Sequence, residues 1–166
     1  EVLAGVPNPP FDNSGMDGYA IRAEDSKRET PLPVLGEQPA GLDRHLKLEP
    51  GSAIRIFTGA PVPQGADAVI MQEDVDSTES GDGEAIRCRE TVVPGENIRR
   101  VGADLCRGQI ILEKGSRLTA GRIGLLASQG LESVEVPVLP RVAVLSTGDE
   151  LARPGTALHS GQIYDS

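Results

Sequence analysis

Residues 52–71 read SAIRIFTGAPVPQGADAVIM, and this stretch decides the fold. The segment 52–57 (SAIRIF) has the alternating pattern of a strand, and the segment 68–71 (AVIM) is a continuous apolar run of the kind found in buried strands. The ten residues between them include two prolines and two glycines, which interrupt regular structure. The stretch therefore predicts two strands joined by an irregular turn.

The surrounding sequence has the same character from about residue 20 to residue 100. Residues 19–22 (YAIR) are typical of the start of a strand, and residues 85–89 (AIRCR) alternate between apolar and charged side chains. The acidic stretch 73–84, between the strand patterns 68–71 and 85–89, predicts a long hairpin tip. No helical period is convincing here, so we expect no helix longer than about 12 residues between positions 30 and 100.

The last third of the chain has a different pattern. Residues 119–129 predict a helix with Thr119 as its N-cap and Gly130 just past its end. Residues 133–138 (SVEVPV) and 161–164 (GQIY) predict short strands. Residues 141–145 (RVAVL) are apolar after the arginine, which is typical of an interior parallel strand in an α/β sheet. Because such a sheet needs further strands and crossover helices, we expect this chain to be a fragment.

Composition limits the classes of partner. The 166 residues carry 25 acidic and 16 basic side chains, a formal net charge of −9, which argues against nucleic-acid binding. No apolar run approaches the roughly 18 residues of a membrane span, so no membrane partner is expected. The two cysteines are too few for a structural zinc site, and a reducing cytoplasm is the default location. Dinucleotide-binding, Walker A and zinc-protease motifs are absent.

Four stretches combine small residues with isolated polar groups, as a site for a phosphorylated ligand does. They are 13–19 (NSGMDGY), 58–63 (TGAPVP), 97–104 (NIRRVGAD) and 146–150 (STGDE). Each also has a purely structural interpretation: an Asx-turn, a proline-stiffened turn, surface ion pairs and an ordinary turn, respectively.

The stretch 146–150 follows the predicted buried strand, where open α/β sheets bind ligands. Hydroxyls and free amides at Ser146 and Thr147 suit a phosphate, and Glu150 offers a hard oxygen ligand to Mg²⁺. The residues 164–166 (YDS) also lie at a predicted strand end and can face the same crevice.

Together these stretches resemble the molybdopterin molybdenumtransferase family, to which the gephyrin E domain also belongs. The resemblance rests on segments in the family's order that cover almost the whole chain: 10–22 (PFDNSGMDGYAIR), 55–73 (RIFTGAPVPQGADAVIMQE), 97–108 (NIRRVGADLCRG), 115–130 and 140–166. Gly15 stands where alanine is usual in the family. Ala103 stands where glutamate is common, which removes one carboxylate near Asp104.

The resemblance implies Mg²⁺-dependent insertion of molybdate into the dithiolene of adenylylated molybdopterin, with release of AMP. It implies a homodimer, in which Asp17 and Thr58 approach the cleft of the other protomer. The functional positions that match the family's motifs are Asp17, Thr58, Asp104 and Glu150, with Glu150 as a Mg²⁺ ligand. The residues expected around the pterin or nucleotide phosphates are Ser146, Thr147, Gly148, Asp165 and Ser166.

The fold class expected from the residues and the resemblance together is mainly β with α/β. Residues 1–17 and 99–137 are expected to form a linking region with one helix, and residues 18–98 a β-rich domain inserted in it. Residues 139–166 are expected to begin a truncated molybdopterin-binding α/β domain. The family's molybdate pocket and remaining metal carboxylate have no counterpart here, so the fragment alone is expected to be inactive.

Two alternatives to the enzyme stay open. One is a gephyrin-like interaction scaffold that binds a partner peptide, and the other is a β-rich module without a ligand of its own. An exposed apolar groove without carboxylates would favour the scaffold. A cleft lined by Asp17, Thr58 and Asp104 would favour the enzyme.

Overall fold

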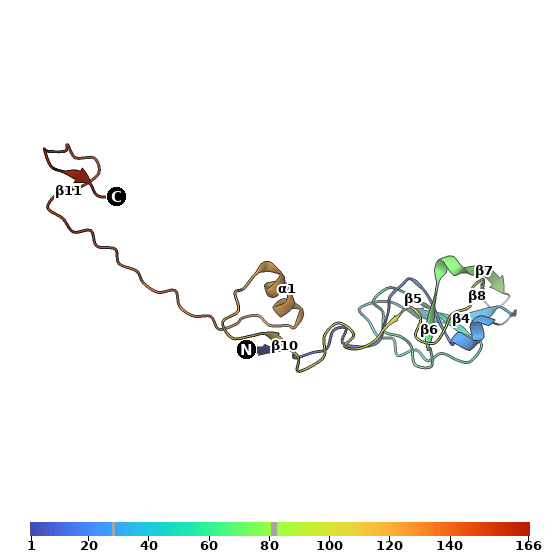
Figure 1. Ribbon diagram of the computed structural model, residues 1–166. Helices are drawn as coiled ribbons and strands as arrows, with labels where there is room; N and C mark the ends of the chain where they lie inside the picture. Colours follow the sequence, from blue (N-terminus) through green and yellow to red (C-terminus); the bar gives the residue numbers. More distant parts are fainter. Residues whose placement is uncertain (28, 81–82) are drawn as a thin grey trace. The chain divides into compact units, whose positions relative to one another are not determined.

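The computed structural model describes residues 1–27, 29–80 and 83–166 (Figure 1). The chain forms two compact units, Glu1–Leu131 and Glu132–Ser166. The first unit contains the main sheet and the α-helix, and the second contains a single pair of very short strands.

The main sheet has six strands in the order β6-β3-β5-β4-β8-β7. All neighbouring strands run antiparallel except β4 and β5, which run parallel. The strands predicted at 19–22, 52–57, 68–71 and 85–89 are confirmed, each within a few residues of its expected bounds. The six strands are β3 (Gly18–Ile21), β4 (Leu32–Gln38), β5 (Ala53–Ile56), β6 (Ala68–Met71), β7 (Val75–Ser80) and β8 (Gly83–Cys88).

The sheet is packed on both faces, because its strands send apolar side chains to two core clusters. On β3, Tyr19 and Ile21 belong to one cluster and Ala20 to the other. On β6, Ile70 joins the first cluster and Val69 the second. A strand buried on both sides needs apolar residues at successive positions, which explains the AVIM run of β6, although β6 is the first strand in the sheet order.

The acidic stretch before β8 is an edge strand and not a long loop. β7 and β8 pair in unbroken register from Val75 opposite Cys88 to Ser80 opposite Gly83. The predicted long hairpin tip is therefore wrong for residues 75–80, and residues 81 and 82 of that prediction lie outside the described residues. Backbone hydrogen bonds to β8 do not require apolar side chains, and polar side chains are common on edge strands.

Helical structure is short. The predicted helix is confirmed as α1 (Ala120–Ser128), with Thr119 Oγ1 accepting a hydrogen bond from the Arg122 backbone N–H at 3.4 Å. Two 3₁₀ helices, η1 (Ala23–Lys27) and η2 (Gln72–Asp74), flank strands of the sheet. In the described part of the chain no helix longer than η2 lies between positions 30 and 100, and no helix is long and apolar enough to cross a membrane.

The chain enters and leaves the six-stranded sheet along two paired segments. β1 (Val2–Leu3) pairs antiparallel with β10 (Ile110–Leu112), and β2 (Asn13–Ser14) pairs antiparallel with β9 (Ile98–Arg99). Between these pairs, Asn8 donates a backbone hydrogen bond to the carbonyl of Leu105 at 2.8 Å. Residues before and after the main sheet thus lie side by side.

The second unit corrects two predictions. β12 (Ile163–Tyr164) confirms the strand expected at 161–164, and it pairs in parallel with β11 (Leu151–Ala152). The strands expected at 133–138 and 141–145 are absent from the described structure, and Val142, Val144 and Leu145 are 80–87% exposed. A strand forms only where a neighbour supplies hydrogen bonds, and within residues 132–166 only β11 and β12 pair.

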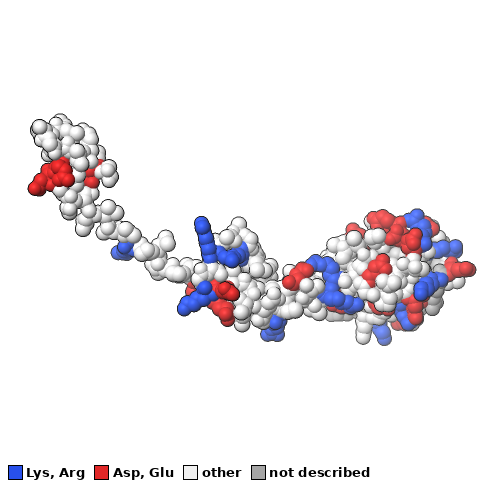
Figure 2. Space-filling view, in the orientation of Figure 1, with Lys and Arg blue, Asp and Glu red and all other residues white. Residues whose placement is uncertain are grey.

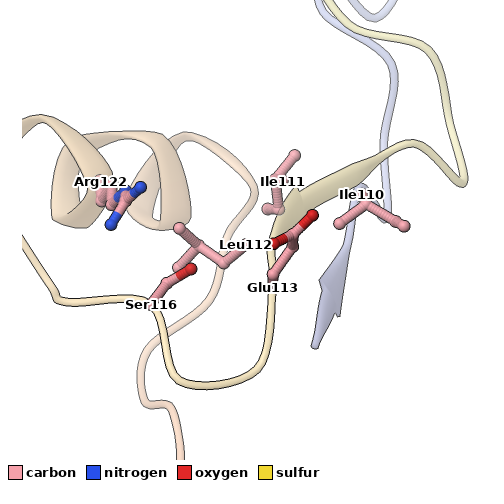
Figure 3. A pocket seen from close by; sticks show the side chains of 6 residues that line it. All are labelled: Ile110, Ile111, Leu112, Glu113, Ser116 and Arg122. Atoms are coloured by element: carbon pink, nitrogen blue, oxygen red, sulfur yellow. The ribbon is translucent and has the colours of Figure 1, made fainter.

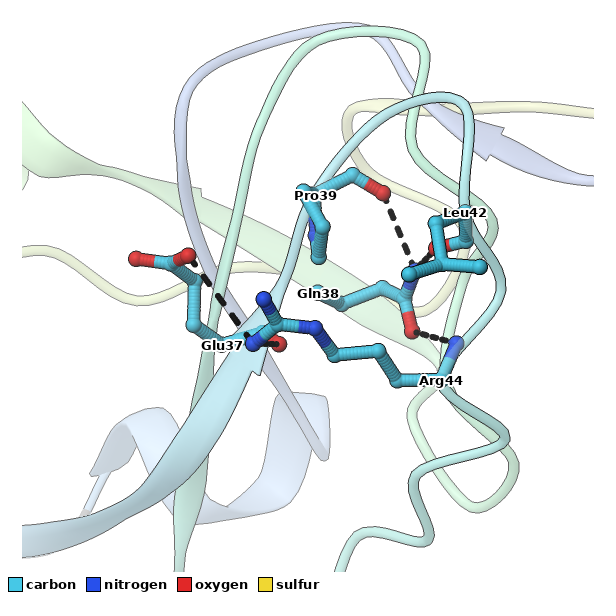
Figure 4. A network of polar contacts seen from close by, with 5 residues as sticks. All are labelled: Glu37, Gln38, Pro39, Leu42 and Arg44. Carbon is cyan, nitrogen blue, oxygen red and sulfur yellow. Dashed lines mark hydrogen bonds and ion pairs between the residues drawn. The ribbon is translucent and has the colours of Figure 1, made fainter.

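A buried glutamine organises the long connection from β4 to β5 (Figure 4). Gln38 is 1% exposed, and its Nε2 donates to the carbonyls of Pro39 at 3.0 Å and Leu42 at 2.6 Å. Its Oε1 accepts from the Arg44 backbone N–H at 3.0 Å. The Arg44 guanidinium is exposed and donates to the backbone carbonyl of Glu37. One amide side chain therefore satisfies three backbone groups of the loop.

We expect Gln38→Leu to lower the free energy of unfolding by about 3 kcal/mol, because it removes the side-chain partner of three backbone groups of the loop. Chemical denaturation measures this change. Arg44→Ala is the matched control, since it keeps the backbone N–H and removes only exposed contacts, and it should cost less than about 1 kcal/mol. Equal losses in the two variants would contradict this role of Gln38.

Candidate functional site

The ends of three neighbouring strands meet at one edge of the main sheet. β3 runs antiparallel to both β5 and β6, and Gly18 at its start lies opposite Ile56 and Met71 at their ends. Residues just before β3 and just after β5 and β6 are therefore neighbours in space. Asp17 and Thr58, two of the predicted site residues, lie at this edge.

The stretches 12–17 and 58–62 are held together by their backbones. The Ser14 N–H donates to the carbonyl of Ala60 at 2.9 Å, and the Gly59 N–H donates to the carbonyl of Ser14 at 2.8 Å. A further bond joins the Val62 N–H to the carbonyl of Asp12 at 3.0 Å. The two motifs therefore form one unit, which no spacing along the chain could reveal.

Asp17 and Thr58 form the centre of this unit. The Thr58 backbone N–H and hydroxyl both donate to Asp17 Oδ1, at 2.7 and 2.8 Å. These two hydrogen bonds, together with the positive charge of Arg55, lower the pKa of Asp17 below its ordinary value. The structure thus brings these two predicted residues into direct contact, with the carboxylate ionised and exposed.

Close backbone packing requires glycine at position 18 but not at position 15. A Cβ atom on Gly18 would lie 1.9 Å from the carbonyl oxygen of Ile70, so only glycine fits there. A Cβ atom on Gly15 would lie 3.4 Å from the carbonyl oxygen of Asn97, an ordinary contact distance. The alanine that is usual in the resembling family would therefore fit at position 15, and this departure leaves the site's geometry intact.

Asp104 lies in an ion pair and does not contact Asp17 or Thr58 within the described residues. Arg99 Nη2 donates to Asp104 Oδ2 at 2.6 Å, and both side chains are about half exposed. This is the surface ion pair that the sequence left open as the alternative. Arg99 itself lies on β9, opposite Asn13 of β2, which connects Asp104 to the 12–17 stretch through the backbone.

A second ion pair, between Arg100 and Asp12, lies next to the paired strands β2 and β9. Arg100 Nη1 donates to Asp12 Oδ2 at 2.6 Å, and the Val101 N–H donates to Asp12 Oδ1 at 2.8 Å. The Val101 N–H and the Arg100 guanidinium lower the pKa of Asp12 below its ordinary value. The two adjacent arginines of the 97–104 stretch therefore form ion pairs with carboxylates of this chain.

The remaining predicted residues belong to the second unit. Glu150 folds back over Gly148, where a Cβ atom would lie 2.5–2.7 Å from the glutamate's carboxyl group. Glu150 precedes β11, whereas Asp165 follows β12 and donates its N–H to the carbonyl of Ala152 at 3.0 Å. The two residues thus flank opposite ends of the short strand pair. The exposed residues of this set are Ser146, Thr147, Gly148, Glu150 and Ser166.

The described residues do not form a metal centre by themselves. In that part of the chain no group of three or more His, Cys, Asp or Glu side chains is placed to hold a metal ion. Glu150 supplies a single carboxylate, which does not fill the octahedral coordination sphere of Mg²⁺, so a Mg²⁺ ion held by the described residues alone does not fit.

Sequence reasoning missed Arg55, which lies beside the Asp17–Thr58 pair. Its guanidinium carbon lies 4.9 Å from the ring centroid of Tyr19 and 5.2 Å from that of Phe57. Its Nη2 donates to Gln72 Oε1 at 2.5 Å. The available signal was the arginine between Ile54 and Ile56 in an otherwise apolar strand.

A separate pocket of about 290 Å³ lies between β10 and α1 (Figure 3). It contains none of the predicted site residues. Its lining is mixed, because Glu113, Ser116 and Arg122 accompany the aliphatic side chains. The residues that line it are Ile110, Ile111, Leu112, Glu113, Ser116 and Arg122.

Comparisons with known proteins agree on one family. A family model described as the MoeA N-terminal region (domain I and II) matches residues 1–130. Molybdopterin molybdenumtransferase 2 of Mycobacterium tuberculosis is 47% identical over 173 residues, which cover all of this chain and 41% of the relative. Molybdopterin molybdenumtransferase of Haemophilus influenzae is 45% identical over 166 residues, which cover all of this chain and 40% of the relative.

A solved structure shares the fold as well. The molybdopterin biosynthesis MoeA protein from Pyrococcus horikoshii matches with a TM-score of 0.84 and 39% identity, over 99% of this chain and 42% of that one. The chain therefore spans about two fifths of the length of these relatives.

We expect Thr58→Ala to raise the pKa of Asp17 part of the way towards its ordinary value, because one of two hydrogen bonds to the carboxylate is lost. Since folding lowers this pKa, its stabilising contribution is present above the unfolded pKa and is lost as pH falls through the folded one. An NMR titration of the Asp17 carboxyl carbon measures the shift. Thr78→Ala, on β7, is the control and should leave that titration unchanged.

Proposed function

Because the chain belongs to the MoeA family, we propose that it is the N-terminal part of a molybdopterin molybdenumtransferase of molybdenum cofactor biosynthesis. The reaction is insertion of molybdate into adenylylated molybdopterin with release of AMP. The observation that carries this proposal is the Asp17–Thr58 pair, formed by two motifs through which the chain resembles that family.

Asp17 acts in this proposal as a fixed anionic acceptor. Thr58 occupies Oδ1 with two hydrogen bonds, which orients the carboxylate and keeps it ionised. Oδ2 then accepts a hydrogen bond from the substrate. The carboxylate needs no reorganisation when the substrate arrives, since its partner is already in place.

Asp104 contributes indirectly, through the Arg99 guanidinium that it holds near the 12–17 stretch. Of the second unit's residues, Ser146, Thr147 and Gly148 offer hydroxyl and amide donors to the phosphates of the pterin or the nucleotide. Asp165 and Ser166 belong to the same proposed phosphate and pterin site.

Glu150 contributes one oxygen ligand to Mg²⁺ in the family's scheme. When bound, Mg²⁺ neutralises negative charge on phosphoanhydride oxygens. One carboxylate does not complete the coordination of Mg²⁺, so the ion would need further ligands.

The domain division remains part of this proposal. Residues 1–17 and 99–137 form the linking region, residues 18–98 the β-rich domain, and residues 139–166 the start of the molybdopterin-binding α/β domain. The antiparallel pairs β1–β10 and β2–β9 support the first two assignments. A cytoplasmic homodimer is the assembly that we propose for the whole protein.

The peptide-binding scaffold is the weaker alternative. It would be favoured by an apolar groove free of carboxylates, whereas the pocket at α1 includes Glu113 and Arg122. The enzyme would be favoured by a cleft lined by Asp17, Thr58 and Asp104. Contact between Asp17 and Thr58 supports it in part, whereas Asp104 pairs with Arg99.

A chimaera tests the proposed function. This chain replaces the corresponding region of the Haemophilus influenzae relative, to which it is 45% identical. We expect the chimaera to restore molybdoenzyme activity in cells that lack their own molybdopterin molybdenumtransferase. Asp17→Asn should reduce this activity at least about tenfold, because an oriented charge is removed from the site.

Asp43→Asn is the matched control for the chimaera, since Asp43 pairs with His45 in the exposed connection after β4. It should leave the activity unchanged. A stable chimaera that fails to restore activity would contradict the proposed function. Full activity of Asp17→Asn would remove Asp17 from the mechanism.

Glu150→Gln in the chimaera tests the metal ligand. We expect the Mg²⁺ concentration for half-maximal activity to rise about tenfold, because a neutral amide oxygen replaces a carboxylate. Nucleotide binding without metal should be largely spared. Asp149→Asn is the matched control. An equal effect of both changes would show that the negative charge of the loop matters, and would contradict Glu150 as a specific Mg²⁺ ligand.

A further inference from the structure

Arg55 occupies an unusual position for a charged side chain. It lies on β5 between Ile54 and Ile56, which are at most 1% exposed, and opposite Tyr19 of β3. Its side chain shares the sheet face of Tyr19, since residues directly opposite each other in a sheet lie on one face. The strand ends at Ile56, so Arg55 stands within three residues of Thr58.

The guanidinium is held from several sides. It lies near the rings of Tyr19 and Phe57, at 4.9 and 5.2 Å from their centroids, within the range of cation–π attraction. Gln72 accepts one of its N–H groups at 2.5 Å. Tyr19 is fixed in turn, because its hydroxyl donates to Glu84 Oε1 at 2.8 Å. These contacts order the cation before any ligand binds.

None of these contacts neutralises the charge of Arg55. Within the described residues it has no ion pair, and Glu37, which stands opposite it on β4, is 4.0 Å from the Arg44 guanidinium. An arginine has five N–H donors, and Gln72 uses one of them. By contrast, carboxylates pair with the arginines at Arg22, Arg44, Arg89, Arg99 and Arg100.

The geometry points to Arg55 as the group that binds a phosphate oxygen of the ligand, beside the Asp17–Thr58 pair. This inference rests on the proposed function, which supplies a phosphoanhydride substrate. An ionised Asp17 repels an approaching phosphate unless a cation stands close by, and Arg55 is that cation. A guanidinium can also donate two parallel hydrogen bonds to a phosphate, which fixes the ligand's orientation.

Because the surrounding surface has no general positive charge, binding of a phosphate there requires an individually placed cation. On the face shown in Figure 2, acidic and basic side chains are interspersed over the part that contains the six-stranded sheet. The whole chain carries a net charge of −9. A general positive field therefore does not attract anions here, and a phosphate needs a specifically placed donor.

The test uses the 166-residue chain and inorganic pyrophosphate as the probe. Binding is followed by NMR through the backbone amides of Thr58 and Gly59. We expect pyrophosphate to shift these amides, and Arg55→Met to weaken binding at least about tenfold while keeping the side chain's aliphatic length. Arg55→Lys should weaken it about threefold, since an ammonium cannot donate in the same forked geometry.

Arg87→Met is the matched control, because Arg87 is an exposed strand arginine on β8 and, among the described residues, the cation–π contacts belong to Arg55. It should leave binding unchanged. Absence of pyrophosphate shifts in the wild-type chain, or equal binding by all variants, would overturn the inference. If Arg55→Met does not fold, Arg55→Lys decides, and wild-type binding by that variant would overturn it as well.

The chimaera separates this inference from the proposed function. If the chimaera is active and Arg55→Met is fully active in it, Arg55 is not part of the substrate site although the function stands. If the chimaera is inactive while pyrophosphate binding still depends on Arg55, the anion site stands and the function fails.

Discussion

The close approach of β3 to β6 is the constraint on which the rest of this structure depends. With no Cβ atom, Gly18 lets the two backbones come so near that any other residue would meet the carbonyl oxygen of Ile70 at 1.9 Å. β3 can then pair with β5 on one side and β6 on the other, and its next three residues are buried. Asp17 immediately precedes this glycine, so the same packing that forms the sheet positions the carboxylate.

The antiparallel arrangement explains why the functional groups gather at one edge. The start of β3 faces the ends of β5 and β6, and these strand ends bring Asp17, Thr58 and Gln72 together. Gln72 donates its backbone N–H to the carbonyl of Asp17 at 3.1 Å, and its side chain accepts from Arg55. The Asp17 carboxylate and the Arg55 guanidinium thus lie in one small region. Each is hydrogen-bonded by a neutral group, and among the described residues the two do not form an ion pair with each other. Charged groups ordered in this way are ready for a ligand without reorganisation.

The second unit shows the opposite case, in which apolar sequence does not suffice for structure. Residues 141–145 have the composition of an interior strand, but among the described residues they have no hydrogen-bonded neighbour strand, and they are largely exposed. The pair β11–β12 forms because Leu151 and Ala152 find partners at Ile163 and Tyr164. Burial and pairing are properties of the surroundings, and a segment's own pattern reports only what it would do if those surroundings were present.

The sequence by itself determined the β-rich class, the positions of four strands in the main sheet, the helix with its Thr119 cap, and the family resemblance. These features follow from local patterns: alternation, proline and glycine breaks, capping residues and motifs. Only the tertiary structure decided that Thr58 hydrogen-bonds Asp17, that Asp104 pairs with Arg99, and that Arg55 stays without an ion pair among the described residues. Contacts between residues far apart in the chain depend on strand order and register, and a local pattern contains neither.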